Sequence, residues 1–425
     1  MKKALLLLAA AAACAIALPA TAARNKTLKG SGKIVTETRD VGSFHAVEAG
    51  SIAHVLVGDY PAGRVTVKTD DNLLVHVQTS VAEGTLRIGL ADVTVQNAEL
   101  TVYVPAAGIT RLDAKGIAAF SLETPLAGIT GLKAGGAAKI TAEHPLQTND
   151  AAIETSGTAH IAVEAMTGTL ERISATGGSV IELKGQPAGA DAAIETSGTA
   201  HIAVEAMTGT LERISATGGS VIELKGQPAG ADAAIETNGT AHIAVEAMTG
   251  TLERISATGG SVIELKGQPA GADAAIETNG TAHIAVEAMT GTLERISATG
   301  GSEIKLKSTA TGRAIELRAS GTSRLVCNGE LLCDDASIES SGAARITTRV
   351  KCTECRIESS GTSATQVSLD ATSLHAESSG GAGMTLAGTT RACRIVAGGT
   401  SRIDATGLKS EQWDTTVGKY SALKR

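Results

Sequence analysis

Aromatic residues are almost missing from this chain of 425 residues, which has two Phe, three Tyr and one Trp. Stacking of bases or sugar rings on aromatic side chains therefore contributes little to any binding. The formal net charge is −7, whereas nucleic-acid binding calls for a basic face. We expect no nucleic-acid partner. A hydrophobic content of 43% excludes a disordered chain. Because aromatic residues are so few, the core must be thin and built from Ile, Leu, Val and Ala.

Long apolar runs are confined to the N-terminus. Residues 4–18 are apolar, follow Lys2 and Lys3, and precede small residues at 20–22. This order is typical of a cleaved export signal, and the run is too short to span a bilayer comfortably. We expect residues 1–22 to be a signal peptide and no transmembrane segment to remain after its removal. The mature chain is then exported, either to the periplasm or to the cell surface and beyond.

The middle of the chain is a tandem repeat. A segment of 41 residues begins at Ala151 and recurs almost unchanged at Ala192, Ala233 and Ala274, so that the block covers residues 151–302. Periods of 20 to 50 residues indicate solenoids or propellers. The repeat therefore restricts the fold to a solenoid or a propeller.

A weaker period of 19 to 21 residues lies within and beyond this block, marked by a glycine. Aliphatic residues stand four before and four after the glycine, and small residues stand two after it. Offsets of two, four and six are strand periodicity, and a glycine suits a corner that needs positive φ. The corner glycines of the block include Gly157, Gly177, Gly198, Gly218, Gly239 and Gly259.

This period predicts an all-β fold, a parallel β-helix (β-solenoid) with coils of about 20 residues. A propeller blade would need about twice that length. We expect a strand-rich N-terminal part at 23–105, β-helix coils at 106–405 and a short C-terminal cap at 406–425. The cap would cover the last strands, because an open sheet edge invites association.

Charged residues seven positions after the corner glycines alternate in sign. The column begins with Glu164, Lys184, Glu205 and Lys225. Opposite charges on neighbouring strands favour this register. A solvated outer face explains the column better than a binding strip does.

Histidine also recurs, at His160, His201, His242 and His283. These residues fall on every second coil, so neighbours lie roughly 9–10 Å apart, whereas ligands lie about 2.0–2.2 Å from a zinc ion. We expect no metal and no cofactor.

Five cysteines follow the signal segment. Cys333 and Cys352 each stand nine residues before a corner glycine, so they would stack on adjacent coils, and export permits a disulfide. A Cys333–Cys352 bond is preferred, with Cys327–Cys333 as the competing pair. Cys327 falls on an inward column, while Cys355 and Cys393 would lie two coils apart.

The N-terminal third carries a family resemblance. Its elements are Arg39-Asp40-Val41 followed by Phe44, then Val47–Gly50, Asp70–Leu74 and Gly84–Ile88. With the later SGT and SGA corners, this stretch resembles the family described as putative auto-transporter adhesin, head GIN domain. The resemblance spans Gly30 to about Ala405 and implies an exported bacterial β-helix protein with an adhesin-like role. The end of the chain, GLKSEQWDTTVGKYSALKR, does not resemble the family's usual last glycine-rich coil.

Three functions follow as hypotheses. The first is a non-enzymatic, adhesin-like surface or envelope binding protein that presents an extended repeat face to an envelope, cell-surface or glycan partner. The alternative is a periplasmic structural or scaffold protein. A polysaccharide lyase-like enzyme fits less well, because such enzymes cluster carboxylates in a cleft built by long loops, whereas these coils are uniformly short.

Overall fold

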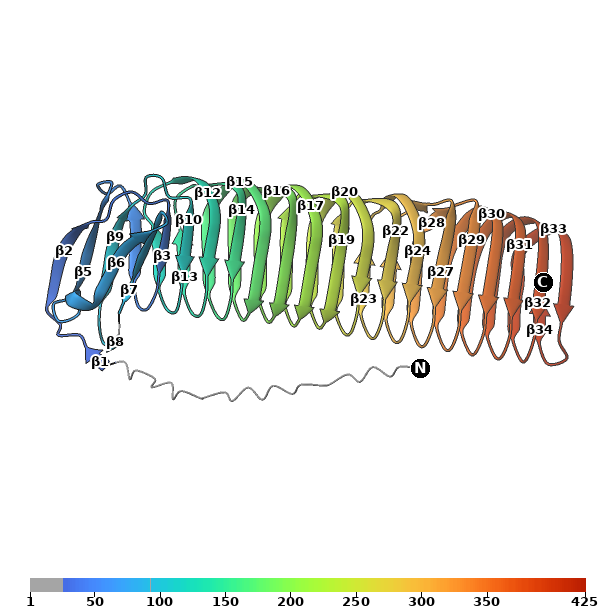
Figure 1. The fold of residues 1–425 in the computed structure, drawn as a ribbon. Helices are drawn as coiled ribbons and strands as arrows, with labels where there is room; N and C mark the ends of the chain where they lie inside the picture. The colour runs from blue at the N-terminus through green and yellow to red at the C-terminus, as the bar shows by residue number, and fades with distance from the viewer. Residues whose placement is uncertain (1–25, 92) are drawn as a thin grey trace, which may run out of the picture.

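The protein is described by a computed structural model over residues 26–91 and 93–425, so the expected signal peptide lies outside the described residues. The described chain is almost entirely β-strand and forms a parallel β-solenoid of about 16 coils. Figure 1 shows these coils stacked as a long rod, with the earliest strands at one end and the C-terminus at the other. The expected fold class is confirmed.

The secondary structure falls into three stretches. The N-terminal stretch contains β1 (Lys26–Lys29), β2 (Ile34–Asp40), β3 (Ala46–Ala49), β4 (His54–Gly58), β5 (Arg64–Asp70), the 3₁₀ helix η1 (Leu74–His76), β6 (Val77–Ala82), β7 (Thr85–Leu90), β8 (Val93–Gln96) and β9 (Leu100–Pro105). The middle stretch contains β10 (Arg111–Ala114), β11 (Ala119–Leu122), β12 (Leu126–Ala134), β13 (Lys139–Ala142), β14 (Leu146–Thr155), β15 (His160–Gly177), β16 (Val180–Gly198), β17 (His201–Gly218), β18 (Val221–Gly226), β19 (Ala229–Gly239), β20 (His242–Ala257), β21 (Val262–Gly267), β22 (Ala270–Thr278) and β23 (His283–Val286). The last stretch contains β24 (Thr290–Ala298), β25 (Glu303–Leu306), β26 (Ala310–Thr311), β27 (Ala314–Ala319), β28 (Arg324–Leu332), β29 (Asp335–Ser340), β30 (Arg345–Ser359), β31 (Ala364–Ser378), β32 (Gly383–Ala397), β33 (Arg402–Val417) and β34 (Ala422–Lys424).

Each coil bends at fixed points. Along β15 and β16 the pairing is parallel, and its register shifts after Val163 and again after Leu170. These shifts divide the strand into three straight segments. Within a segment alternate residues are buried, such as Ile161 and Val163, because successive side chains of a strand point to opposite faces. The coil thus encloses a core while every second side chain faces outward.

The core is a continuous column of aliphatic side chains. Ile161, Ile181 and Ile202 are fully buried and stack in register from coil to coil. Among the described residues Phe120 is the one aromatic side chain that is fully buried. A coil of about 20 residues leaves room for one layer of branched side chains, which explains the scarcity of rings in the sequence.

Buried hydroxyl groups form a second inward column. The hydroxyls of Thr155 and Ser179 lie 2.8 Å apart, and Ser179 also donates to the carbonyl of Thr176 at 2.9 Å. The equivalent pair recurs in the next repeat at Thr196 and Ser220. Partners of this kind remove the penalty for burying a polar group.

The parallel stack begins before residue 106, where the expected coil region starts. β3 pairs in parallel with β10, placing Val47 beside Leu112, and β4 pairs in parallel with β11. Residues 59–105 interrupt the 20-residue spacing between these partners, so the first coil is hidden in the sequence. Within this insertion β7 and β9 also pair in parallel, with β3 and β4, and so extend the stack. The antiparallel pairs are β2–β5, β5–β9 and β6–β7.

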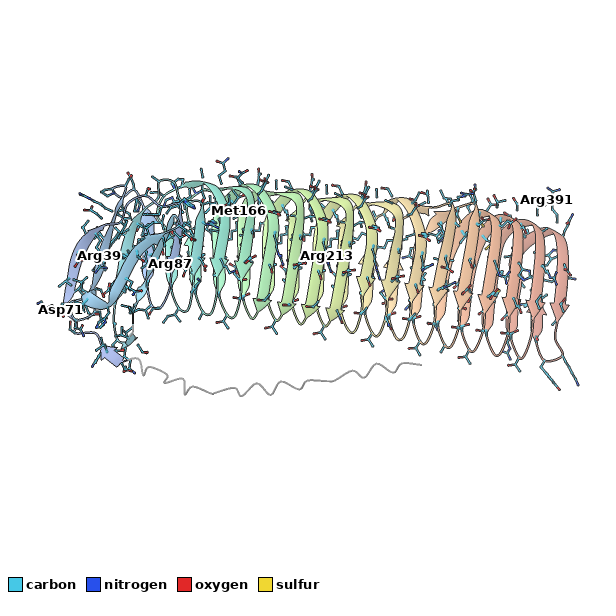
Figure 2. All side chains as sticks on the ribbon, viewed as in Figure 1. Arg39, Asp71, Arg87, Met166, Arg213 and Arg391 are labelled. Atoms are coloured by element: carbon cyan, nitrogen blue, oxygen red, sulfur yellow. The ribbon has the colours of Figure 1, made fainter. Side chains whose placement is uncertain are left out.

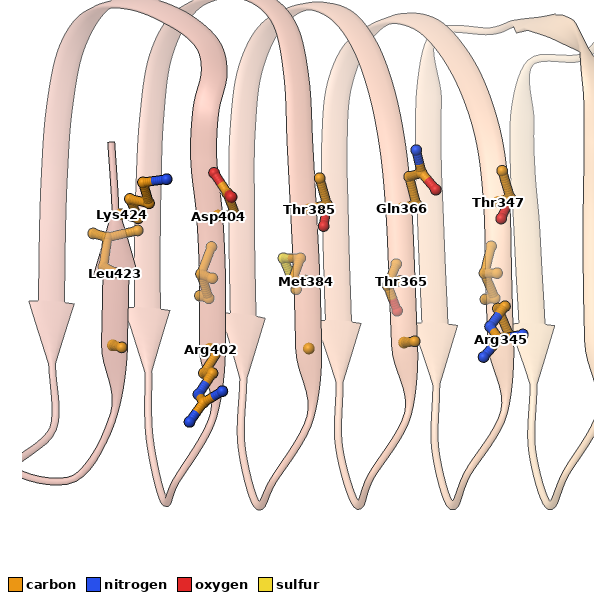
Figure 3. Close-up of a pocket in the computed structure, with 15 residues that line it drawn as sticks. Arg345, Thr347, Thr365, Gln366, Met384, Thr385, Arg402, Asp404, Leu423 and Lys424 are labelled. Carbon is orange, nitrogen blue, oxygen red and sulfur yellow. The ribbon is translucent and has the colours of Figure 1, made fainter.

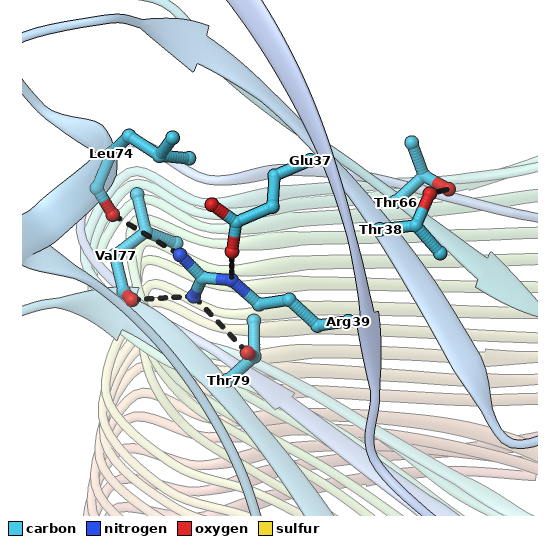
Figure 4. A network of polar contacts seen from close by, with 7 residues as sticks. All are labelled: Glu37, Thr38, Arg39, Thr66, Leu74, Val77 and Thr79. Carbon is cyan, nitrogen blue, oxygen red and sulfur yellow. Dashed lines mark hydrogen bonds and ion pairs between the residues drawn. The ribbon is translucent and has the colours of Figure 1, made fainter.

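One arginine ties the antiparallel strands together. Arg39 on β2 donates from Nε to Glu37 at 2.6 Å and from its terminal nitrogens to the carbonyls of Val77 at 2.7 Å and Leu74 at 3.1 Å. It also donates to the hydroxyl of Thr79 at 3.2 Å. Figure 4 shows the guanidinium between β2 and the η1–β6 segment. A planar fork of five donors suits this arrangement.

The C-terminal residues 406–425 form most of the last coil. β33 pairs in register with β32 as far as Val417, and β34 adds a short segment against β33. Trp413 lies beside Cys393, packs half-buried against the core, and donates from Nε1 to the carbonyl of Ser410 at 3.2 Å. In the described part of the chain, no helix has the length and apolar character needed to cross a membrane.

Candidate functional site

The corner glycines form a stacked column along one edge of the rod. Gly157, Gly177, Gly198, Gly218, Gly239 and Gly259 have φ between 75° and 82°. A Cβ atom added to any of them would lie 2.5 to 2.7 Å from the carbonyl oxygen of the glycine one coil earlier. Both the backbone conformation and the contact between coils therefore require glycine. This edge is a structural corner with no side chains to present to a ligand.

The expected charge column lies on an outer face and is stacked coil on coil. Lys184 donates to both carboxylate oxygens of Glu164, at 3.0 and 2.9 Å, and this contact raises the pKa of Lys184. At the far end of the block Lys307 lies 3.3 Å from Glu287. Between them, Lys225 and Lys266 make no ion pair with any described residue. The column is thus closely paired at its two ends only.

A second set of ion pairs escaped the sequence reasoning. Arg172 donates to Glu195 at 2.7 Å, and the contact recurs in the next two repeats as Arg213–Glu236 and Arg254–Glu277, both at 3.0 Å. Arg172 stands directly opposite Ala193, so each pair is diagonal across two strands. The sequence contains the signal for these pairs, an Arg directly before the core isoleucine of one coil and a Glu directly after the core isoleucine of the next coil. Figure 2 shows Arg213 on the side of the rod among the outward side chains.

The histidine column has the spacing that the sequence predicts. His160 stands opposite Val180, and Val180 opposite His201, so valines separate the histidines. His160 Nε2 lies 3.7 Å from Glu182 on the next coil. Within the described residues no group of three or more His, Cys, Asp or Glu side chains is arranged to hold a metal ion.

Three of the five cysteines, Cys333, Cys352 and Cys355, lie near one corner in the C-terminal third of the chain. All five are thiols in this structure. Leu332 stands opposite Lys351, which places Cys333 beside Cys352, and the hydrogen bond between these two thiols and their burial raise the pKa of Cys333. A hydrogen bond with Cys333 lowers the pKa of Cys352, but a second with Cys355 and burial outweigh it and raise the value to about 12. Three thiols are therefore neighbours here.

The other two cysteines lie apart from this group. Cys327 is buried in the core opposite Leu306. Leu374 separates Cys355 from Cys393 in the stack, which is the two-coil separation that the sequence predicts.

Short coils, corner glycines and repeated outer faces define the protein as a repetitive β-solenoid. Its exposed surface is formed by the outward side chains of the coil strands. The sequence profile of the family described as "Putative auto-transporter adhesin, head GIN domain" matches residues 43–203 and 334–418, more than half of the chain. The chain belongs to this family. No curated relative matches the sequence.

Several solved structures are similar to the chain. A putative adhesin from Bacteroides fragilis shares 18% identity, with a TM-score of 0.41, over 51% of this chain and 98% of its own. A putative lipid binding protein from Parabacteroides distasonis shares 14% identity, with a TM-score of 0.36, over 72% of this chain and 99% of its own. A putative adhesin from Parabacteroides merdae shares 16% identity, with a TM-score of 0.31, over 72% of this chain and 98% of its own.

Proposed function

We propose that this protein is exported and acts without catalysis, as an adhesin-like rod that binds partners at the cell envelope or cell surface. The observation that carries the proposal is the repetition of one outer surface along the rod. Arg213 and Glu236 form the same contact as Arg254 and Glu277 one repeat later. A surface that recurs every 41 residues offers the same contacts several times to one extended partner.

Repetition changes the strength of binding without any new contact. When one weak site is occupied, the next site on the same rod meets the partner at a raised local concentration. A rod built from duplicated segments can also change its reach by gaining or losing whole repeats. The family to which the chain belongs supports a role in binding an external partner.

A periplasmic scaffold is the second candidate, and location separates the two. We would treat intact and permeabilised cells with a protease and follow the mature chain with an antibody. Cleavage on intact cells, while a periplasmic marker protein stays whole, would support the surface-binding role. Protection until the outer membrane is opened would overturn it in favour of the scaffold.

A further inference from the structure

A shallow groove crosses the outer face of the rod near its C-terminal end. It has a volume of about 500 Å³ and lies over adjacent strands β30 to β34. One side of it is a register row in which Arg345, Ala364, Gly383, Arg402 and Ala422 follow one another. Figure 3 shows the two arginines, Arg345 and Arg402, on either side of the small residues in the middle of this row. Their side chains are three coils apart, or roughly 14 Å at strand spacing.

The hollow is a local departure from the rest of the rod. The same outward column carries His283, Glu303 and Arg324 on the preceding coils. It then falls to Ala364 and Gly383, and a Cβ atom added to Gly383 would meet no atom within 4 Å. Two small residues between two arginines therefore create an open floor with a cation at each end.

The groove is basic although the protein is acidic. Arg345 and Arg402 are exposed and form no ion pair with any described residue. Asp404 is the one acidic side chain among the residues that line the groove. Residues 343–425 contain eleven Lys and Arg against seven Asp and Glu, whereas the whole chain has a formal net charge of −7.

The second side of the groove is polar and neutral over its middle. Thr347, Gln366 and Thr385 follow one another in register. They point outward beside the arginine row (Figure 3), and their side chains make no hydrogen bond within the described part of the chain. Hydroxyl and amide groups of this kind pair with the hydroxyls of a sugar.

We infer that this groove binds a linear polysaccharide that carries carboxylate groups, such as a polyuronate. Arginine pairs with carboxylates through two parallel hydrogen bonds, and a chain with repeated carboxylates reaches both arginines, whereas a small anion reaches one. The groove has no aromatic lining residue, so charge and hydrogen bonds replace stacking on the sugar rings. This inference rests on the proposed binding role and goes beyond it, because the groove at residues 345–424 is a separate site outside the repeats with a partner of stated chemical class.

The test uses purified mature protein, residues 23–425, and polygalacturonate as the probe in titration calorimetry at low and high salt. One variant, Arg345→Gln with Arg402→Gln, removes both cations. A second, Gly383→Glu, fills the floor with an acidic side chain at a position where the fold has room for it. The matched control, Arg87→Gln with Arg391→Gln, removes the same charge from two exposed arginines that lie outside the groove and outside the repeats, and that form no ion pair with any described residue.

We expect binding that weakens as salt is added, at least a tenfold loss in each groove variant, and less than a twofold change in the control. Dextran, which has no charge, should not bind. Absence of binding to polygalacturonate at low salt would overturn the inference, as would an equal loss in the control variant. Equal binding of polyglutamate would replace the polysaccharide by an acidic peptide.

A second copy of the chain is the remaining occupant to test. Sedimentation at low salt tests for it. Oligomers of the native chain that are absent from the Arg345→Gln, Arg402→Gln variant would overturn the polysaccharide assignment. The binding assay uses purified protein, so its failure leaves the surface location to be judged by protease accessibility. Cell-surface exposure without polyuronate binding would thus refute the groove as a polyuronate site and leave the proposed function standing.

Discussion

At the scale of single residues, the corner glycines are the positions where the fold tolerates least. Changing Gly218 to Ala places a side chain at φ 79° and puts its Cβ 2.6 Å from the carbonyl oxygen of Gly198. We expect a loss of about 1–2 kcal/mol from the left-handed backbone alone, with more from the contact. In a solenoid each coil contacts only its neighbours, so hydrogen exchange should report faster opening of the adjacent coils.

Gly383→Ala is the matched control for this change. Gly383 lies in a strand with open space at its Cβ position, and replacing such a glycine should leave stability unchanged or raise it by about 0.4–1 kcal/mol. Equal exchange rates in the Gly218→Ala and Gly383→Ala variants would contradict the argument.

Cys327 makes stability depend on pH. Burial raises the pKa of its thiol from 9.0 to about 12, because the charged thiolate is disfavoured in the core. The unfolded chain then releases this proton at lower pH than the folded chain does. The stabilisation is complete below about pH 9 and is lost as pH rises towards 12.

The variant Cys327→Val removes this titration and keeps an apolar core side chain. We expect the thermal unfolding midpoint of the reduced native protein to fall more between pH 8 and pH 11 than that of the variant. Parallel pH profiles for the two proteins would show that Cys327 contributes nothing to the effect.

At the scale of the element, Arg39 is the main link between β2 and the η1–β6 segment (Figure 4). Arg39→Lys keeps the charge but cannot reach the carbonyls of Leu74 and Val77 together. Leaving those acceptors without their charged donor should cost roughly 1–3 kcal/mol. Faster hydrogen exchange in residues 74–82, with little change in the distant repeats, is the expected readout. Uniform exchange along the chain would contradict this local role.

The pairing of β28–β29 with β30 bears on the disulfide that the sequence predicts. Cys333 donates its backbone N–H to the carbonyl of Lys351 at 3.0 Å, which keeps it next to Cys352. We therefore predict that protein recovered from an oxidising compartment contains a Cys333–Cys352 bond. Closing a loop of this size stabilises a fold by about 3 kcal/mol in the chain-entropy account.

Peptide mapping without reduction tests this pairing. The expected product is one cross-linked peptide pair that disappears in Cys352→Ser and leaves Cys327 free. A link between Cys352 and Cys355, or between Cys327 and Cys333, would refute the assignment.

The sequence was sufficient to predict the coils because inward positions are tightly constrained. Ile161, Ile181 and Ile202 must all fill the same narrow core, so their spacing reveals the stack. Outward positions obey no such rule, and the small pair Ala364 and Gly383 becomes a groove only when register places it between two arginines. The first coil, at β3 and β4, was hidden for a different reason, since the insertion before β10 breaks the period.

At the scale of the whole molecule, the rod must end without offering a sheet edge to another rod. The long strand of the last coil, β33, carries Lys409, Glu411 and Asp414 as exposed side chains, and charges on an edge oppose pairing with a second chain. Thr415 of β33 stands in register with Ile395 of β32, so a polar residue replaces an apolar one. Arg425 lies over the ring of Trp413, 5.6 Å from its centroid. The last coil is therefore more polar than the coils it covers.

Deleting residues 406–425 removes this polar coil. The new end would expose the backbone of β32 from Ala387 to Ala397 and uncover the side chains of Cys393 and Ile395, which are buried in the native rod. Unpaired strand groups beside fresh apolar surface favour edge-to-edge association. We expect oligomers or aggregates on size exclusion with light scattering, whereas deletion of 418–425 alone keeps the charged strand and should remain monomeric. Monomeric elution of the longer deletion would show that the last coil is dispensable as a cap, and that the rod limits association by some other means.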